Sequence, residues 1–356
     1  MAEPALEAAE AKPLGPRERA WKEITDLGLQ SYVADLDAHG YCVMPPEIAN
    51  PNNLSERLLE ALLNVAERRN GERPDVVTGA THAYKPALLH GYDSARYGKD
   101  GSEIEAGKEA TDPALLGQDD AVDSPFGDGM ALIFNEEEVF AEAVMNPPLL
   151  ALVTYLVGHS GVLSSMGCWM KSPCRSNFAL HSDSGLPNPL PSIAYQAQFT
   201  YVLTDFDREN GATCIVPGSH KWCRRPTDTE AALLPYEEGG KDQAVVIEAP
   251  PGSLVCWHGN TWHGAFNRIT PGLRVSMTVY FVRQFMRPLE DYIGRVPQKL
   301  LDRYGPRFAM ALQQGSVPGA TTQSSRVANT ASAEKVRAAY EREVGVDLGS
   351  KGDHYA

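Results

Sequence analysis

Two histidines and one aspartate in this sequence have the types and spacing of metal ligands. The first pair is His181 and Asp183, in the segment Asn177-Phe-Ala-Leu-His-Ser-Asp183. In a strand, residues two apart project from the same face, so an imidazole and a carboxylate would stand side by side. A divalent metal binds such a pair as adjacent ligands. The alternative for this pair alone is a surface turn, because Gly185 and Pro187 follow it closely.

A third candidate ligand, His263, lies 82 residues after His181, in Thr261-Trp-His-Gly-Ala-Phe-Asn267. Two histidines and one carboxylate, with other coordination positions left open, form the facial triad of non-haem iron(II) oxygenases. His258 competes with His263 for the third position. Its alternative is a histidine in the core or at the mouth of a barrel, because Leu254 and Cys256 share its face of a strand.

The segment that starts at Arg274 predicts a binding site for an anion. In a strand, Arg274, Ser276, Thr278 and Tyr280 share one face, while the other face carries Val275, Met277, Val279 and Phe281. A guanidinium offers a planar fork of donors to a carboxylate, and the serine adds a further donor. For Arg274 alone, a solvated strand face is the alternative.

The elements that must position these residues change in character along the chain. Apolar residues recur at helical spacing over 17–39, and further helices are expected over 54–69 and 136–156, the last one broken at Pro147-Pro148. A short strand is expected over 40–45, and the polar segment 71–128 is expected to be a long loop or lid.

From Gly161 onward, short apolar runs typical of strands alternate with turns of Gly, Pro and Asn. The runs cover 162–171, 194–204, 214–216, 244–247, 253–257 and 273–282. Many short strands after a group of helices predict a mainly β protein with flanking helices, built on an antiparallel double-sheet barrel or jelly roll.

We expect three regions along the chain. Residues 1–15 are predicted to be a disordered tail, and residues 16–290 to form the β-barrel domain with its helices and the loop at 71–128. Residues 291–356 are predicted to be a helical extension, with helix over 284–312, a Ser/Thr/Gly linker over 315–331 and a short helix around 333–344.

Composition excludes several classes of function. The chain has 356 residues and a formal net charge of -14, which argues against nucleic acid and against an anionic membrane surface as partners. The N-terminus lacks the basic start and apolar stretch of a signal peptide, and the six cysteines include no Cys-x-x-Cys pair. We therefore expect the cysteines to be buried reduced thiols and the protein to be cytoplasmic. We expect its partner to be a small-molecule substrate, and the protein to be a monomer or homodimer.

The order of these motifs resembles the phytanoyl-CoA dioxygenase family. The resemblance rests on His181-x-Asp183, on Asn210-Gly-Ala-Thr-Cys-Ile-Val-Pro-Gly-Ser-His220, on Gly252-Ser-Leu-Val and on His263-Gly-x-x-x-Asn267 with Arg274-x-Ser276. It spans roughly residues 31–285 and implies a double-stranded β-helix (a jelly-roll or cupin-like core) that uses Fe(II), 2-oxoglutarate and O2.

The resemblance also implies a role for each matching residue. His181, Asp183 and His263 would be the metal ligands and catalytic centre, and Arg274 with Ser276 would hold the distal carboxylate of 2-oxoglutarate. Lys171 matches a lysine found near the cosubstrate in the family, and Gln198 and Thr200 share a strand face that would line the same pocket. The resemblance favours His263 over His258 as the third ligand and gives His220 a structural role.

The expected reaction is hydroxylation of an unactivated C–H bond of a small organic metabolite, with release of succinate and CO2. Related halogenases have a small residue in place of Asp183, so a carboxylate there favours hydroxylation, although desaturation and ring formation stay open. The alternatives are an acyl-CoA hydroxylase of the same family, a Zn- or Mn-dependent cupin-like hydrolase, and a binding protein. His82 and His90, in the expected lid, are further candidates for a substrate contact.

Overall fold

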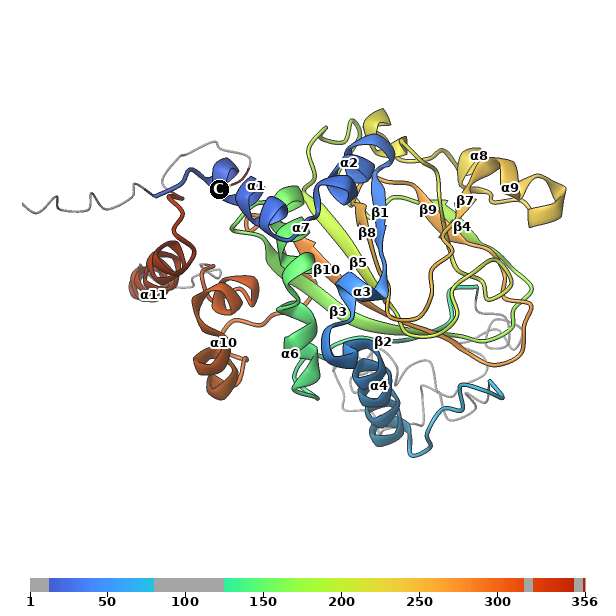
Figure 1. The fold of residues 1–356 in the computed structure, drawn as a ribbon, viewed down its shortest axis with the longest axis horizontal. Helices are drawn as coiled ribbons and strands as arrows, with labels where there is room; N and C mark the ends of the chain where they lie inside the picture. The colour runs from blue at the N-terminus through green and yellow to red at the C-terminus, as the bar shows by residue number, and fades with distance from the viewer. Residues whose placement is uncertain (1–12, 80–124, 317–322, 349–354, 356) are drawn as a thin grey trace, which may run out of the picture.

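The computed structural model describes residues 13–79, 125–316, 323–348 and residue 355. Two antiparallel sheets form its centre (Figure 1). The larger sheet has the strand order β1 (Tyr41–Met44), β8 (Leu254–His258), β5 (Gln196–Val202), β10 (Arg274–Val282), β3 (Val162–Lys171) and β2 (Asp128–Met130). The smaller sheet has the order β4 (Phe178–His181), β9 (His263–Ala265), β6 (Thr213–Ile215) and β7 (Val245–Val246). The predicted double-sheet fold with flanking helices is confirmed.

Helices flank both sheets and occupy both ends of the described chain (Figure 1). The N-terminal half contributes α1 (Pro16–Asp26), α2 (Gln30–His39), α3 (Pro46–Ala49), α4 (Leu54–Asn70), α6 (Val139–Val144) and α7 (Pro147–Val157). The later part contributes α8 (Asp228–Ala231), α9 (Gly240–Gln243), α10 (Gln298–Ala311) and α11 (Gln323–Val344). Short 3-10 turns lie at Pro51–Asn53, Ser219–Trp222 and Tyr236–Glu238. Within the described ranges, none of the helices is both long and apolar enough to cross a membrane.

Three expectations about the helices need correction. The run at 17–39 is two helices, because the chain turns between them at Gly28, where φ is +68°. The last helix starts at Gln323, well inside the segment expected to be a Ser/Thr/Gly linker. Contacts with α10 and the burial of Ala333, Tyr340 and Val344 stabilise it, so packing overrides the weak local propensity. Helix is also absent from 284–297, which the structure describes as turns and coil.

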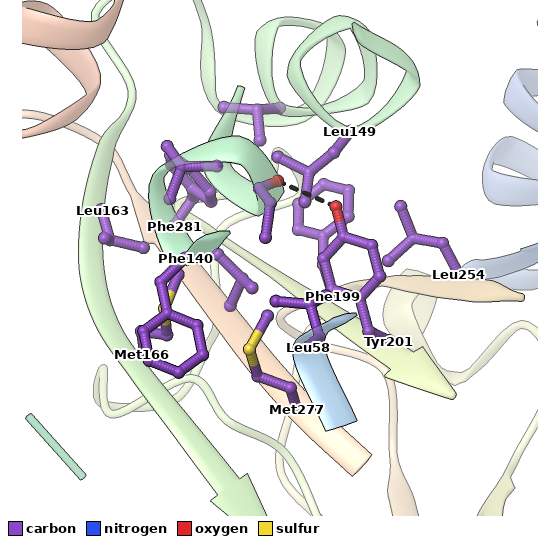
Figure 2. Close-up of a cluster of buried hydrophobic side chains, with 14 of the residues drawn as sticks. Leu58, Phe140, Leu149, Leu163, Met166, Phe199, Tyr201, Leu254, Met277 and Phe281 are labelled. Atoms are coloured by element: carbon purple, nitrogen blue, oxygen red, sulfur yellow. Dashed lines mark hydrogen bonds between the residues drawn. The ribbon is translucent and has the colours of Figure 1, made fainter. Parts of the chain in front are cut away.

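The larger sheet separates an apolar core from the functional cavity. On one face, side chains of β3, β5 and β10 pack against the helical layer, as Figure 2 shows for Met166, Phe199, Tyr201, Met277 and Phe281. The predicted alternation of β10 is confirmed, because its apolar residues lie in this core and its polar residues line a cavity on the other face. The six cysteines are free, but only Cys42, Cys168, Cys214 and Cys256 are buried as expected, whereas Cys174 and Cys223 are partly exposed.

The C-terminal helices are fixed to the helical layer by buried polar contacts. Arg307 of α10 makes two hydrogen bonds to Glu23 of α1, of 2.6 and 3.0 Å. His159 lies 3.1 Å from the hydroxyl of Tyr340 through Nδ1 and 3.0 Å from the Pro16 carbonyl through Nε2. Leu14, at the edge of the expected N-terminal tail, forms a β-bridge with Val346. Residues 1–12 and most of the expected lid, including His82 and His90, lie outside the described residues.

Candidate metal centre

His181, Asp183 and His263 come together where the ends of β4 and β9 meet. His181 is the last residue of β4 and pairs directly with His263, the first residue of β9. The Asp183 Oδ1 atom lies 3.8 Å from Nε2 of His181 and 3.6 Å from Nε2 of His263. One possible ligand atom from each residue lies within 4.8 Å of the ligand atoms of the other two. This spacing fits a single metal ion.

The His-x-Asp pair is not formed by strand alternation, which corrects one step of the sequence argument. The strand ends at His181, and Asp183 lies in the turn that follows. This turn is held by the carbonyl of Gly259, which accepts hydrogen bonds from the Ser182 hydroxyl (3.0 Å) and the Ser184 amide (3.2 Å). The turn, and not the pleat, brings the carboxylate back to the imidazoles.

Both imidazoles are oriented for metal binding through Nε2. The Nδ1 atom of His181 lies 3.1 Å from the Ala179 carbonyl, and Nδ1 of His263 lies 3.0 Å from the Thr261 carbonyl. A carbonyl can only accept, so each Nδ1 carries the proton and each Nε2 is left with its lone pair. Burial, and then the neighbouring His263, lower the pKa of His181 to about 4, which keeps this imidazole neutral and able to bind a metal.

The three residues border a cavity of about 290 Å³ between the two sheets. The polar residues expected on one face of β10, namely Arg274, Ser276, Thr278 and Tyr280, all line it. Its wall also contains a row of aromatic rings, with Phe126 centred 3.8 Å from Trp169 and 4.5 Å from Phe178. The remaining lining residues are Ser165, Gln198, Thr200, Thr213, Trp257, Gly264, Ala265 and Leu289.

Arg274 is a buried cation without a carboxylate partner among the described residues. Its Nη1 donates to the Gly211 carbonyl at 3.0 Å, its guanidinium lies over the ring of Phe206, and its Nε has no hydrogen-bond partner in the described structure. Burial, and then the neighbouring Arg268, lower its pKa to about 10, so it is still charged at neutral pH. An unpaired buried charge is unfavourable, and an anionic ligand in the cavity would compensate it.

The turn at Asn210-Gly211, the start of the motif Asn210–His220, supports this arginine. Gly211 has φ +67°, and a Cβ there would approach the Arg268 amide nitrogen to 2.9 Å and the Lys171 Cε to 3.0 Å. The Asn210 side chain accepts a hydrogen bond of 2.6 Å from Arg268. Only glycine fits this position, and its carbonyl then faces Arg274.

The other predicted cosubstrate residues lie in different settings. Gln198 and Thr200 of β5 pair with Tyr280 and Thr278 of β10, respectively. Like Ser276, they line the cavity. The Thr200 Oγ1 has no hydrogen-bond partner in the described part of the chain. Lys171 is completely buried next to this wall, is not among the lining residues, and donates to the Phe266 carbonyl at 2.7 Å. Burial, and then Arg274, lower the pKa of Lys171 to about 7.

His258 and His220 lie away from the triad. Both line a different cavity, on the side of α2 and α7, with ring centres 5.4 Å apart. His258 Nδ1 accepts a 3.0 Å hydrogen bond from the Asn260 amide, and a Cβ at Gly40 would approach His220 Nδ1 to 2.5 Å. The tight packing of His220 agrees with the structural role expected for it, and the structure groups His263, not His258, with His181 and Asp183.

Trp257 is a residue of the site that the sequence argument did not single out. Its indole Nε1 donates to Asp183 Oδ2 at 3.2 Å, and its ring centre lies 4.9 Å from that of His263. The available signal was the alternation of β8, where Trp257 must face away from Cys256 and His258 and therefore toward the second sheet.

Comparisons with known proteins give the family of this chain. The model of the phytanoyl-CoA dioxygenase (PhyH) family matches residues 36–276, well over half of the chain. A curated relative, dioxygenase af480 from Aspergillus fumigatus, is 29% identical over 169 residues, which cover 47% of this chain and 52% of that protein. The multifunctional dioxygenase prhA from Penicillium brasilianum is 34% identical over 103 residues, 29% of this chain and 33% of that protein. The match thus spans about half, or less, of the length of these relatives.

Among solved structures, EctD from S. alaskensis with bound Fe is similar over 80% of this chain and 83% of that chain, with 17% identity and a TM-score of 0.46. The match to the family model includes the smaller sheet and all of the larger sheet except residues 277–282 of β10. It contains all three grouped residues as well as Arg274 and Ser276. The chain therefore belongs to the phytanoyl-CoA dioxygenase family, within the Fe- and 2-oxoglutarate-dependent dioxygenases.

Proposed function

We propose that this protein hydroxylates an unactivated C–H bond of a small organic molecule, using Fe(II), 2-oxoglutarate and O2. His181, Asp183 and His263 would hold the iron, and this donor set of two imidazoles and one carboxylate suits Fe(II). When bound, the iron and its cosubstrate supply oxidation of the substrate coupled to conversion of 2-oxoglutarate to succinate and CO2. The protein would orient the metal ligands and hold the cosubstrate in the cavity between the two sheets.

The observation that supports this proposal best is the position of Arg274. A metal-dependent hydrolase or a binding protein needs no buried guanidinium in the cavity of its metal ligands. A keto acid that chelates the metal at one end needs a partner for the carboxylate at its other end. Arg274 meets this need because it shares the cavity with the triad and has an unpaired Nε.

We assign the neighbouring polar groups to the same carboxylate. Ser276 lies two residues along β10 on the face of Arg274, and the Thr200 hydroxyl is available as a donor from the adjacent strand. Gln198 lies opposite Tyr280 and is placed to contact either the cosubstrate or the substrate. Lys171 would act indirectly, because its ammonium binds the Phe266 carbonyl and adds positive charge beside Arg274.

The lining of the cavity favours an uncharged substrate with an apolar or aromatic face. Apart from the triad and Arg274, every described lining side chain is neutral. Since the cosubstrate would take Arg274, a substrate carboxylate or phosphate inside this cavity would meet no second cation from the described chain. The rings of Phe126, Trp169 and Phe178 offer apolar surface, and Ser165 and Gln198 offer hydrogen bonds.

The test is anaerobic addition of Fe(II) and 2-oxoglutarate to the metal-free protein, followed by visible absorption spectroscopy. A metal-to-ligand charge-transfer band should appear in the wild type and be lost in His263→Ala. His258→Ala is the matched control and should keep the band, because His258 lies in another cavity. A band retained in His263→Ala, or no band with wild type, would contradict the assignment. Succinate release in the presence of candidate substrates then measures turnover, which Asp183→Ala should abolish.

A further inference from the structure

Asp183 differs from the other two proposed ligands because it lies outside a strand. His181 and His263 are paired with each other across β4 and β9, so the ladder fixes both backbones. Asp183 lies beyond the end of β4, and 23% of its side chain is exposed, between 37% for His181 and 8% for His263. A carboxylate in such a turn can rotate and bind a metal through one oxygen or through two, so something must select its orientation.

Trp257 provides the contact that selects one orientation. It lies in β8 between β1 and β5, paired with Tyr41 on one side and Gln198 on the other, and it is only 4% exposed. Its indole N–H binds Asp183 Oδ2, whereas Oδ1 is the oxygen that faces both histidine Nε2 atoms. With Oδ2 occupied as an acceptor, Oδ1 alone is directed at the metal position.

The same end of β8 also holds the backbone of the Asp183 turn. Gly259, two residues after Trp257, accepts hydrogen bonds from Ser182 and Ser184, which flank the aspartate. The turn and its carboxylate are therefore both held by the C-terminal end of β8, through Trp257, and by Gly259 just after it. Outer contacts of this type are known to tune metal ligands and typically affect metal affinity.

We propose that Trp257 is a positioning residue that keeps Asp183 as a one-oxygen ligand and so leaves coordination positions open for the cosubstrate and oxygen. This inference rests on the proposed function, because it presumes that the triad binds iron. In this proposal Trp257 acts through its hydrogen bond to Asp183, and it is therefore a positioning residue and not a catalytic one.

The test compares two Trp→Phe variants that each lose one buried indole N–H hydrogen bond. Trp257→Phe keeps most of the ring beside His263 and removes the donor to Asp183. Trp262→Phe is the matched control, because Trp262 is 3% exposed and its Nε1 donates at 2.9 Å to the Arg224 carbonyl, away from the cavity lining. The dissociation constant for Fe(II) is measured anaerobically by competition with a chromophoric chelator, and the thermal unfolding of the metal-free proteins is recorded alongside.

We expect Trp257→Phe to raise the dissociation constant for Fe(II) by about 10- to 100-fold and Trp262→Phe to leave it within about twofold. The visible spectrum of the Co(II)-loaded protein should change in Trp257→Phe only, because the coordination of the carboxylate changes. Equal Fe(II) affinities and Co(II) spectra in wild type and Trp257→Phe would overturn the inference, as would equal losses in the two variants. A wild type that does not bind Fe(II) would instead refute the proposed function.

A second measurement covers the case in which Trp257→Phe does not fold. The chain has 5 tryptophans, so protein labelled with 15N-tryptophan gives a small set of indole N–H resonances. Asp183→Ala should shift one of them in the metal-free protein, and Zn(II) should shift the same resonance in the wild type. If no indole resonance responds to both changes, the hydrogen bond does not couple Trp257 to the metal ligand and the inference is wrong.

Discussion

Arg274→Met separates binding of the cosubstrate from stability of the fold. Burial lowers the pKa of Arg274 from 12.5 to about 10, which corresponds to about 3 kcal/mol of unfavourable free energy for the charged form. Methionine removes this cost and fills much of the same volume. It also removes the hydrogen bond to the Gly211 carbonyl, whose loss in a buried site costs about 1–3 kcal/mol. The free energy of unfolding should therefore stay constant or rise by up to about 2 kcal/mol.

The effect on 2-oxoglutarate should be opposite and large. Hydrogen bonds to charged groups are worth about 1.5–3 kcal/mol each, and a guanidinium can make two with a carboxylate. Loss of about 3 kcal/mol weakens binding by about 100-fold. The variant should thus be at least as stable as the wild type without ligand, yet nearly unable to bind the cosubstrate.

The assay is calorimetric titration of 2-oxoglutarate into Zn(II)-loaded protein, which avoids oxidation, together with urea unfolding of the metal-free protein. Arg283→Met is the control for the ligand measurement. Arg283 is also a buried arginine, just after β10, but it donates to the Ala194 and Leu156 carbonyls and does not line the cavity. Its substitution should leave the affinity for 2-oxoglutarate unchanged.

Two results would refute this reasoning. If Arg274→Met lowered the free energy of unfolding by 2 kcal/mol or more, the guanidinium would be part of the support of the fold. If 2-oxoglutarate bound to the variant as tightly as to the wild type, the carboxylate would be held elsewhere.

Two further predictions concern buried charges. The pKa of Lys171 is about 7 in the folded protein and 10.5 in the unfolded chain. Between these pH values the unfolded state binds one more proton than the folded state. The free energy of unfolding should therefore rise with pH across this window, by up to about 5 kcal/mol. Urea unfolding at several pH values should show this rise in the wild type and a flatter profile in Lys171→Met; parallel profiles would contradict it. Arg307→Met should lower the free energy of unfolding by about 3–5 kcal/mol, because it leaves Glu23 buried without its partner. The double variant Glu23→Gln/Arg307→Met should recover part of this loss in the free energy of unfolding. If its loss equalled the sum of the losses in the two single variants, the two residues would not be a coupled pair.

The sequence by itself identified the features that depend on local geometry. The alternation of residues along β10 requires only a period of two, so Arg274, Ser276, Thr278 and Tyr280 could be placed on one face before the sheet was known, and all four line the cavity. The break of the helix at Pro147 is similarly local, because proline cannot continue the preceding turn.

Other features needed the tertiary structure because they join distant parts of the chain. His258 and His263 are five residues apart, and the turn between them resets the direction of the side chains, so alternation alone could not choose between them. The helix from Gln323 exists because it packs on α10, despite a segment rich in Ser and Thr.

Residue types, spacing and the family resemblance were thus enough to propose His181, Asp183 and His263 as metal ligands and Arg274 as the partner of the cosubstrate. The mutual orientation of these side chains depends on how the two sheets pack against each other. Trp257 lies in the larger sheet and Asp183 in the turn after β4 of the smaller sheet, 74 residues earlier, so no periodicity along the chain could predict their hydrogen bond. Local patterns fix which face a side chain takes, whereas the partner it meets there depends on long-range packing.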